Sequence, residues 1–359
     1  MRKMIFALVS AVLIVVFTNS VSAGEPTSPS KKTQPIILKV TNHNPESSSE
    51  SVALKWFGER VNKLTNGQVS FRYFFGGTLA KAGEELEAIK SGVADMGILG
   101  FVYHPAEFAL NGLFYAVPFG PTDPLLYSNI AQKIYATVPA LTGEIKRYNQ
   151  VMLFPIITDS YEINTKKPIR ALGDLNGLKL ATIGIYHPKW VAAIGVVPIT
   201  TPMAERFSGM QTGLIDGQVL STNYISSLKF NELAPNIFMA GLGCTLWAAA
   251  TINQDAWNRL PPDIQKAFAV ASKETADWLG AFLKKNYAQQ IADLKAKKVN
   301  ISTLSDQDKK KWADALPDSP AEWARSMETK GLPGFDVWKQ FKALAEQSGH
   351  KWPREFGIK

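Results

Sequence analysis

The stretch Met210-Gln-Thr-Gly-Leu-Ile-Asp216 decides the fold, because a similar stretch, Ile89-Lys-Ser-Gly-Val-Ala-Asp95, occurs earlier in the chain. Each has the pattern of a helix end, a hydroxyl residue, a glycine able to take positive φ, two apolar residues and an aspartate. We expect both aspartates to bond the backbone at these turns. Two such stretches in one chain indicate two similar lobes. Ligands of open α/β sheets bind at the carboxyl ends of strands, so two facing lobes predict a cleft.

The sequence around each stretch alternates between strand and helix signals, which predicts α/β lobes. In the first lobe we expect strands at 36–40, 69–73 and 93–99, a helix capped by one of the serines at 47–49 that reaches about residue 64, and a helix at 84–91. In the second we expect strands at 177–183, 196–199 and 213–219 and helices at 188–194 and 203–212. Residues 264–298 keep helical spacing throughout, and about 35 residues at 1.5 Å each give a helix of about 50 Å. Such a helix is long enough to span both lobes.

Composition excludes several classes of protein. The chain has 359 residues, 46% of them hydrophobic and 19% charged, which fits two folded domains and argues against disorder. A single cysteine, Cys244, excludes an internal disulfide and cysteine-based metal or iron–sulfur sites. The four histidines are far apart, and the phosphate-loop, nucleophile-elbow and dinucleotide-binding motifs are absent. We therefore expect no enzyme activity, no catalytic residues, no metal and no cofactor.

The N-terminus has the pattern of an export signal. Residues 1–23 carry Arg2 and Lys3, then a mostly apolar run of 14 residues, then Val21-Ser22-Ala23, a small-residue site for cleavage. Residues 24–35 are rich in Ser, Thr, Pro and Lys and are predicted to form a flexible tether. The net charge of +8 comes from scattered lysines, which does not favour nucleic-acid binding. We expect an exported, soluble protein.

An ordered set of segments resembles a known family. The segments are Phe75-Gly-Gly-Thr-Leu79, Ser91-Gly-Val-Ala-Asp-Met96, Pro118-Phe119, Asp174-Leu-Asn-Gly-Leu-Lys-Leu180, Gln211-Thr-Gly-Leu-Ile-Asp-Gly-Gln218 and Trp257-Asn-Arg-Leu-Pro261. In this order and spacing they resemble the DctP-like extracytoplasmic solute-binding proteins of TRAP transporters. The resemblance implies a two-lobed fold like that of periplasmic binding proteins, with a cleft between the lobes and a long helix spanning both. It also implies a monomer in the periplasm that delivers a small-molecule ligand to membrane permease subunits.

The departures from the family pattern concern the ligand. Family members usually carry an arginine after the Gly-Leu-Lys strand residues, where its planar fork pairs with a substrate carboxylate. This chain has Ala181 there, Tyr161 where an accessory arginine is common, and Leu220 where an asparagine is common. The cleft is therefore predicted to be more apolar than usual and to suit a small organic solute with an aromatic or apolar body. The alternative ligand is a small organic acid held by a non-standard anion site, with Lys189, Lys229 or His187 supplying the contact.

Further candidate ligand contacts come from aromatic and polar residues near the expected cleft. They are Phe101, Tyr103, His104, Tyr186, His187, Trp190, Asn223, Tyr224 and Trp247. Side chains of these types suit a flat ligand with a few polar groups, although most buried aromatic residues serve core packing. The alternative function is a periplasmic sensor subunit that binds a ligand and serves a signalling partner.

The predicted organisation has two lobes that the chain enters more than once. The first lobe comprises 36–157 and 247–285, the second 158–246 and 286–340, and residues 341–359 form a C-terminal tail. The chain is expected to cross between the lobes near 156–160 and near 243–246.

Overall fold

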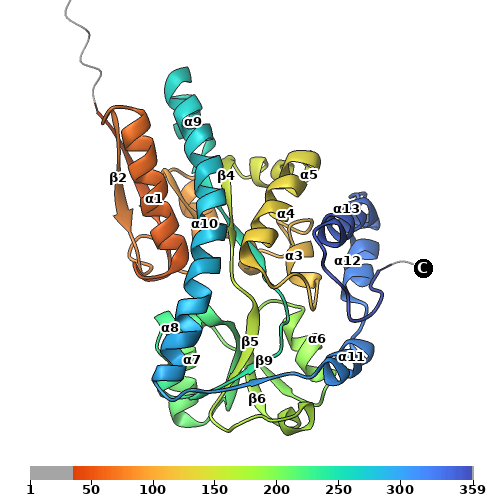
Figure 1. Cartoon of the computed structure of the whole chain (residues 1–359). Coiled ribbons are helices and arrows are strands. Elements are labelled where there is room, and N and C mark those ends of the chain that lie inside the picture. Colours follow the sequence, from red (N-terminus) through yellow and green to blue (C-terminus); the bar gives the residue numbers. More distant parts are fainter. Residues whose placement is uncertain (1–34, 358–359) are drawn as a thin grey trace, which may run out of the picture. The chain divides into compact units, whose positions relative to one another are not determined.

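A computed structural model describes residues 35–357, and its helices and strands form two lobes around two β-sheets (Figure 1). The predicted signal peptide and all but the last residue of the predicted tether lie outside the described residues. No helix within residues 35–357 is long and apolar enough to cross a membrane.

The first lobe is built on a five-stranded sheet of order β2-β1-β3-β10-β4. Its strands are β1 (Ile36–Thr41), β2 (Val69–Phe74), β3 (Met96–Gly100), β4 (Gln150–Ile157) and β10 (Leu246–Asn253). Strand β1 is parallel to β2 and β3, whereas β10 runs antiparallel between β3 and β4. All eight residues of β10 are buried, which fits a strand covered on both faces.

The second lobe is built on a six-stranded sheet of order β11-β9-β5-β8-β6-β7. Its strands are β5 (Tyr161–Thr165), β6 (Lys179–Thr182), β7 (Val197–Thr200), β8 (Gly217–Ser221), β9 (Asn236–Met239) and β11 (Asn300–Thr303). Strand β6 is parallel to β7 and β8, and β5 is antiparallel to its neighbours.

The helices connect these strands and cover the sheets. Those of the first lobe are α1 (Ser49–Leu64), α2 (Glu85–Lys90), α3 (Leu113–Ala116), α4 (Pro124–Thr137), α5 (Pro139–Lys146) and α9 (Gln254–Asn258). Those of the second are α6 (His187–Ala192), α7 (Met203–Thr212) and α8 (Thr222–Ser227). Short 3₁₀ turns lie at Phe101–Tyr103, Leu172–Leu175 and Phe230–Glu232. Helix α1 begins where the side chain of Ser48 accepts a bond from Ser51 N, as the serine run predicts.

The repeated stretch has the same geometry in both lobes. Asp95 Oδ2 accepts a bond from Lys39 N at 2.8 Å, and Asp216 Oδ2 accepts one from Lys179 N at 2.9 Å. The glycine of each stretch has a φ of 79°. Each aspartate therefore ties the turn to the backbone of a neighbouring strand, which confirms the predicted structural role of both.

Helix α10 (Pro262–Ala296) is the 35-residue helix that the periodicity predicts. It packs against α1, α4 and β4 of the first lobe and against α8 of the second. Figure 1 shows it running from the side of α1 to the side of α8. The long helix is therefore shared by both lobes, in agreement with the predicted fold class.

The C-terminal helices depart from the predicted lobe boundaries. Helices α12 (Ser319–Glu328) and α13 (Gly334–Gln347) pack against α3 and α4 of the first lobe, although 286–340 was predicted to belong to the second. Trp323 Nε1 donates to Ala109 O at 2.8 Å, which fixes α12 there. Helix α11 (Asp306–Ala315) stays with the second lobe, because Trp312 Nε1 donates to Trp190 O at 2.9 Å.

The predicted C-terminal tail is also part of the fold. Residues 341–347 complete α13, and the side chains of Phe341 and Phe356 are buried. The ring of Trp352 packs edge-on against Trp338 and Phe356. This segment therefore closes over α13 as a packed element of the structure.

Two of the segments that carry the chain between the lobes, 158–160 and 240–245, are hydrogen-bonded to each other. Thr158 N donates to Thr245 O at 2.9 Å, and Tyr161 N donates to Gly243 O at 3.0 Å. Gly243 has a φ of 107°, and a Cβ there would lie 2.8 Å from Gly120 N. We call these two segments the crossing ribbon.

Gly243→Ala is expected to destabilise the fold by about 3 kcal/mol, because it combines a positive φ with a backbone clash. Gly143→Ala is the matched control, since a Cβ at this position of α5 meets nothing within 4 Å. The control is expected to be as stable as the wild type or up to about 1 kcal/mol more stable. Urea unfolding followed by circular dichroism measures both. Equal midpoints for the two variants would contradict the assigned role of Gly243.

Candidate ligand-binding cleft

A cavity lies between the two sheets, and side chains from both lobes form its wall. The first lobe contributes Asn44, Tyr103, Tyr115 and Trp247, and the second contributes Tyr161, Ile183, Met203 and Tyr224. This inner chamber has a volume of about 20 Å³. An outer pocket of about 480 Å³ shares Asn44, Tyr103 and Met203 with it. The inner chamber holds about one water molecule, so a larger solute needs the lobes to separate.

The topology explains why these residues meet. Tyr161 opens β5 directly after one crossing segment, and Trp247 is the second residue of β10 after the other. Ile183 directly follows β6, and Tyr224 lies in α8, which directly follows β8. Strand ends of an α/β sheet form its ligand-binding edge, so both edges contribute to one chamber.

The chamber wall is aromatic with a few polar groups. The Tyr115 and Tyr161 hydroxyl oxygens lie 3.1 Å apart, which links the lobes across the chamber. Trp247 is 5% exposed, and its Nε1–H has no partner within the described part of the chain. Burial raises the pKa of Tyr161 to about 12, although the Tyr115 hydroxyl and the charge of Arg206 oppose the shift. Both hydroxyls therefore stay protonated at neutral pH. One donates to the other, which leaves the second O–H free to donate to a ligand.

His187 packs directly behind the two tyrosines. Its ring centroid lies 5.0 Å from Tyr115, 4.9 Å from Tyr161 and 4.7 Å from Trp190. Burial, together with the charge of Arg206, lowers the pKa of His187 to about 3. The imidazole is therefore neutral at physiological pH and cannot supply the cation proposed for a non-standard anion site.

Two further hydrogen bonds join the lobes at α1 and α8. Asn223 Nδ2 donates to Ser49 Oγ at 3.1 Å, and the Tyr224 hydroxyl donates to Glu50 Oε2 at 3.0 Å. Gln290 of α10 also donates to Asn223 Oδ1 at 3.0 Å. The two bonds between α1 and α8 need the lobes to be together, so they stabilise the closed cleft.

The predicted site residues separate into three groups. Tyr103, Tyr161, Tyr224 and Trp247 line the inner chamber, while His187, Trp190 and Asn223 lie directly around it. Ala181 and Leu220 are buried in the hydrophobic core of the second lobe with Met210 and Ile215, rather than in the chamber wall. Phe101, His104 and Tyr186 lie on the far side, where His104 packs edge-on against Phe108.

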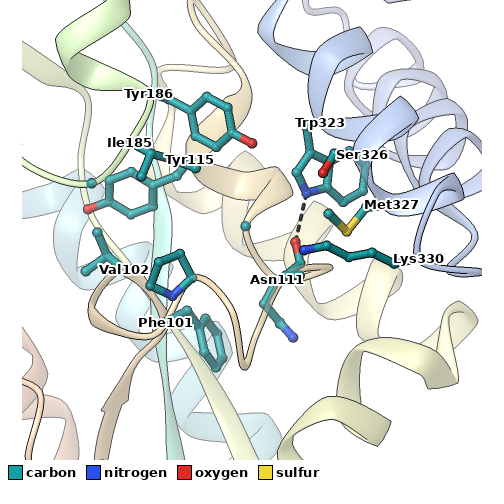
Figure 2. Close-up of a pocket in the computed structure, with 14 residues that line it drawn as sticks. Phe101, Val102, Asn111, Tyr115, Ile185, Tyr186, Trp323, Ser326, Met327 and Lys330 are labelled. Carbon is teal, nitrogen blue, oxygen red and sulfur yellow. Dashed lines mark hydrogen bonds between the residues drawn. The ribbon is translucent and has the colours of Figure 1, made fainter.

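Phe101 and Tyr186 line a separate cavity of about 100 Å³. Figure 2 shows them with Tyr115 on one side and Trp323 and Met327 of α12 on the other. Because Tyr115 also lines the inner chamber, its ring separates the two spaces.

Sequence reasoning missed two contributors. Tyr115 lies in α3, three residues before Pro118, and nothing in the sequence around it marks it as a residue of the chamber wall. Arg206 lies in α7 with an exposed fraction of 0%, beside the chamber tyrosines. The cations that the sequence did suggest are elsewhere: Lys189 pairs with Glu322 at an exposed site, and Lys229 is exposed.

Comparison with known proteins identifies the family. The family model for bacterial extracellular solute-binding proteins, family 7 (DctP), matches residues 40–338. The chain belongs to this family. The DctP family resemblance inferred from the sequence motifs is therefore confirmed, and with it the role of a TRAP-type solute-binding protein.

Individual DctP relatives are distant in sequence but nearly full-length. The 2,3-diketo-L-gulonate-binding periplasmic protein of Escherichia coli is 24% identical, covering 94% of this chain and 98% of the relative. A TRAP periplasmic solute-binding protein from Desulfovibrio salexigens has a TM-score of 0.78 at 26% identity, covering 87% of this chain and 96% of that one. A marine metagenome TRAP protein specific for aromatic acid ligands has a TM-score of 0.79 at 22% identity, covering 88% of this chain and 100% of that one. The two-lobed fold is thus shared.

Two buried carboxyl groups lie at the crossing ribbon of this DctP protein, Asp159 within it and Glu162 in β5 directly after it. Asp159 Oδ2 accepts from Asn223 N at 2.9 Å, and Glu162 Oε2 accepts from Gly241 N at 2.8 Å. Burial raises the pKa of Asp159 to about 6 and that of Glu162 to about 7. Cys244, Tyr287 and Tyr161 are titratable groups that interact with this pair.

The contribution of these two carboxyls to stability is expected to fall as pH rises from about 4.5 to 7. In this window both groups bind more protons in the folded state than in the unfolded state, where carboxyl pKa values are near 4, whereas His187, with its lowered pKa, contributes in the opposite direction. Glu162→Gln removes part of this dependence, so the variant should gain up to about 3 kcal/mol on the wild type between pH 4.5 and 8. Glu232→Gln, at an exposed position, is the control and should keep the wild-type slope. Urea unfolding across this pH range measures it, and parallel wild-type and Glu162→Gln curves would refute the prediction.

Proposed function

We propose that this chain captures a small organic solute with an aromatic or apolar body in the periplasm and delivers it to the permease subunits of a TRAP transporter. The observation that carries the proposal is the chamber between the lobes, walled by four tyrosines and a tryptophan, in a chain of the DctP family. Aromatic walls bury flat apolar ligands efficiently, at roughly 25 cal/mol per Å². The chain acts as a monomeric binding protein without catalysis, exported by the signal at residues 1–23.

The charges near the chamber favour a ligand that carries no more than one acidic group. Glu50 accepts bonds from Asn44, Ser49 and Tyr224, and Glu85 pairs with His43. Both carboxylates act electrostatically on Tyr103 in the chamber wall. A ligand with two carboxylates would place one of them near this negative charge, so small dicarboxylates are disfavoured.

The aromatic-acid specificity of the marine metagenome protein is consistent with this ligand class, although at 22% identity that likeness bears on the fold alone. The sensor alternative differs in its partner, so genes for two membrane permease subunits beside this gene would support transport. A lone histidine kinase gene in that place would support sensing.

Benzoate is expected to raise the thermal unfolding midpoint of the protein, whereas succinate at equal concentration should have little effect. The reason is that succinate buries little apolar area and carries a second carboxylate toward Glu50 and Glu85. Thermal-shift screening with calorimetry of the hits measures this. Micromolar succinate binding without benzoate binding would refute the proposed ligand class.

Ligand binding is expected to shift the population toward the closed state and to reduce the radius of gyration in X-ray scattering. An unchanged scattering profile at saturation would contradict the closure mechanism.

Tyr224→Phe removes the donor to Glu50 and leaves that buried carboxylate one bond short. We expect about tenfold weaker benzoate binding from the loss of about 1.5 kcal/mol in the closed state. Tyr148→Phe is the control, since Tyr148 packs on Phe108 within the first lobe.

A further inference from the structure

Arg206 is a fully buried cation without an acidic partner. Its exposed fraction is 0%, and within residues 35–357 no carboxylate forms an ion pair with it. Burying a charge costs several kcal/mol unless an opposite charge or several hydrogen bonds offset it. The chain thus maintains an uncompensated positive charge beside its ligand chamber.

Neutral acceptors occupy most of the guanidinium of Arg206. Nε donates to Thr201 O at 3.2 Å, and Nη2 donates to Thr182 O at 3.0 Å. Nη1 donates to Val219 O at 3.3 Å and to Gln218 Oε1 at 3.4 Å. An arginine carries five N–H donors in a rigid fork, so these four bonds hold its orientation and leave one Nη2–H available.

The guanidinium lies against the chamber wall. Its acceptor Thr182 is the last residue of β6, and the next residue, Ile183, lines the chamber. Met203 lies one turn before Arg206 on the same face of α7 and lines both the chamber and the outer pocket. The charge of Arg206 also acts on the hydroxyls of Tyr161 and Tyr103, where it opposes the rise in pKa that burial causes.

A second unused donor points to the same conclusion. Trp247 is buried in the chamber wall from the other lobe, and its Nε1–H finds no acceptor within the described residues. Buried indole N–H groups usually have a partner. A cation on one side and an unpaired neutral donor on the other make the chamber complementary to a single carboxylate.

We propose that Arg206 replaces the arginine missing at position 181 and anchors the carboxylate of a monocarboxylate ligand, with Trp247 Nε1–H as a second donor. This proposal rests on the proposed function and specifies its ligand chemistry. Ala181 directly precedes Thr182, so the guanidinium bonds the same strand end from which the usual arginine of the family would extend. The usual anchor of the family lies on β6, whereas Arg206 lies on α7 and places its charge at the end of β6.

The test compares acids with their neutral amides, which have nearly the same shape. Benzoate, phenylacetate and hexanoate are each titrated beside benzamide, phenylacetamide and hexanamide by calorimetry. In the wild type at least one acid should bind ten- to a hundredfold more tightly than its amide, as one charge-assisted bond predicts. Arg206→Gln should reduce that ratio to within about threefold while leaving amide affinity nearly unchanged. Lys229→Met, at an exposed lysine, should keep the wild-type ratio.

Arg206→Lys covers the case in which Arg206→Gln does not fold, because lysine keeps the charge but loses the planar fork. Its acid-to-amide ratio should fall about tenfold. An unchanged ratio in the folded Arg206 variant, or equal wild-type affinity for acid and amide, would overturn the anchor and leave the solute-binding function standing. Failure of every acid and amide to bind would overturn the proposed ligand class and the anchor with it.

Discussion

The pairing of the backbone segments 158–160 and 240–245, which both cross between the lobes, is the constraint on which the rest of the structure depends. Tyr161 N donates to Gly243 O at 3.0 Å and Leu242 N donates to Tyr161 O at 3.1 Å, so each crossing fixes the other. The two strands that follow, β5 and β10, then begin at the cleft, and their first residues include Tyr161 and Trp247. The crossing ribbon is therefore continuous with the chamber wall, and a ligand against Tyr161 touches the residue that directly follows the ribbon.

Closure is stabilised by contacts that are individually modest. The bonds from Asn223 to Ser49 and from Tyr224 to Glu50 join polar groups that water solvates when the lobes separate. Their net contribution to the stability of the closed state is therefore small. A ligand with a few kcal/mol of preference for the closed state can shift the equilibrium between open and closed lobes. The shared helix α10 keeps the lobes together in either state, since it packs on α1 and α4 of one and on α8 of the other.

Local patterns predicted the features that depend on local physics. The Gly-to-Asp stretches, the 35-residue helix and the crossing segments each depend on backbone conformation, helical spacing or the order of strands, and each lies where the sequence placed it. The placement of α12 did not follow from sequence, because it depends on a bond from Trp323 to Ala109 across more than 200 positions. Tyr103, Tyr224 and Trp247 were candidates as aromatic residues near the expected cleft, and Tyr161 was a candidate because it stands where an accessory arginine is common in the family. Ala181 and Leu220 lie among buried residues of β6 and β8 and belong to the core.

Arg206 shows why a site of this kind escapes sequence reasoning. Within Met203–Thr212 an arginine between Glu205 and Phe207 looks like an ordinary polar position of an amphipathic helix, and arginines are mostly exposed. Only the tertiary structure shows that the side chain turns inward and that backbone carbonyls from three separate segments hold it. Carbonyl dipoles orient a cation but do not neutralise it, so the charge remains to act on whatever enters the chamber. A buried guanidinium that is held in place before the ligand arrives loses little entropy on binding. The free-energy cost of removing water from it arises when the protein folds and not when the ligand binds. The buried charge thus lowers the stability of the free protein and raises its affinity for an anion.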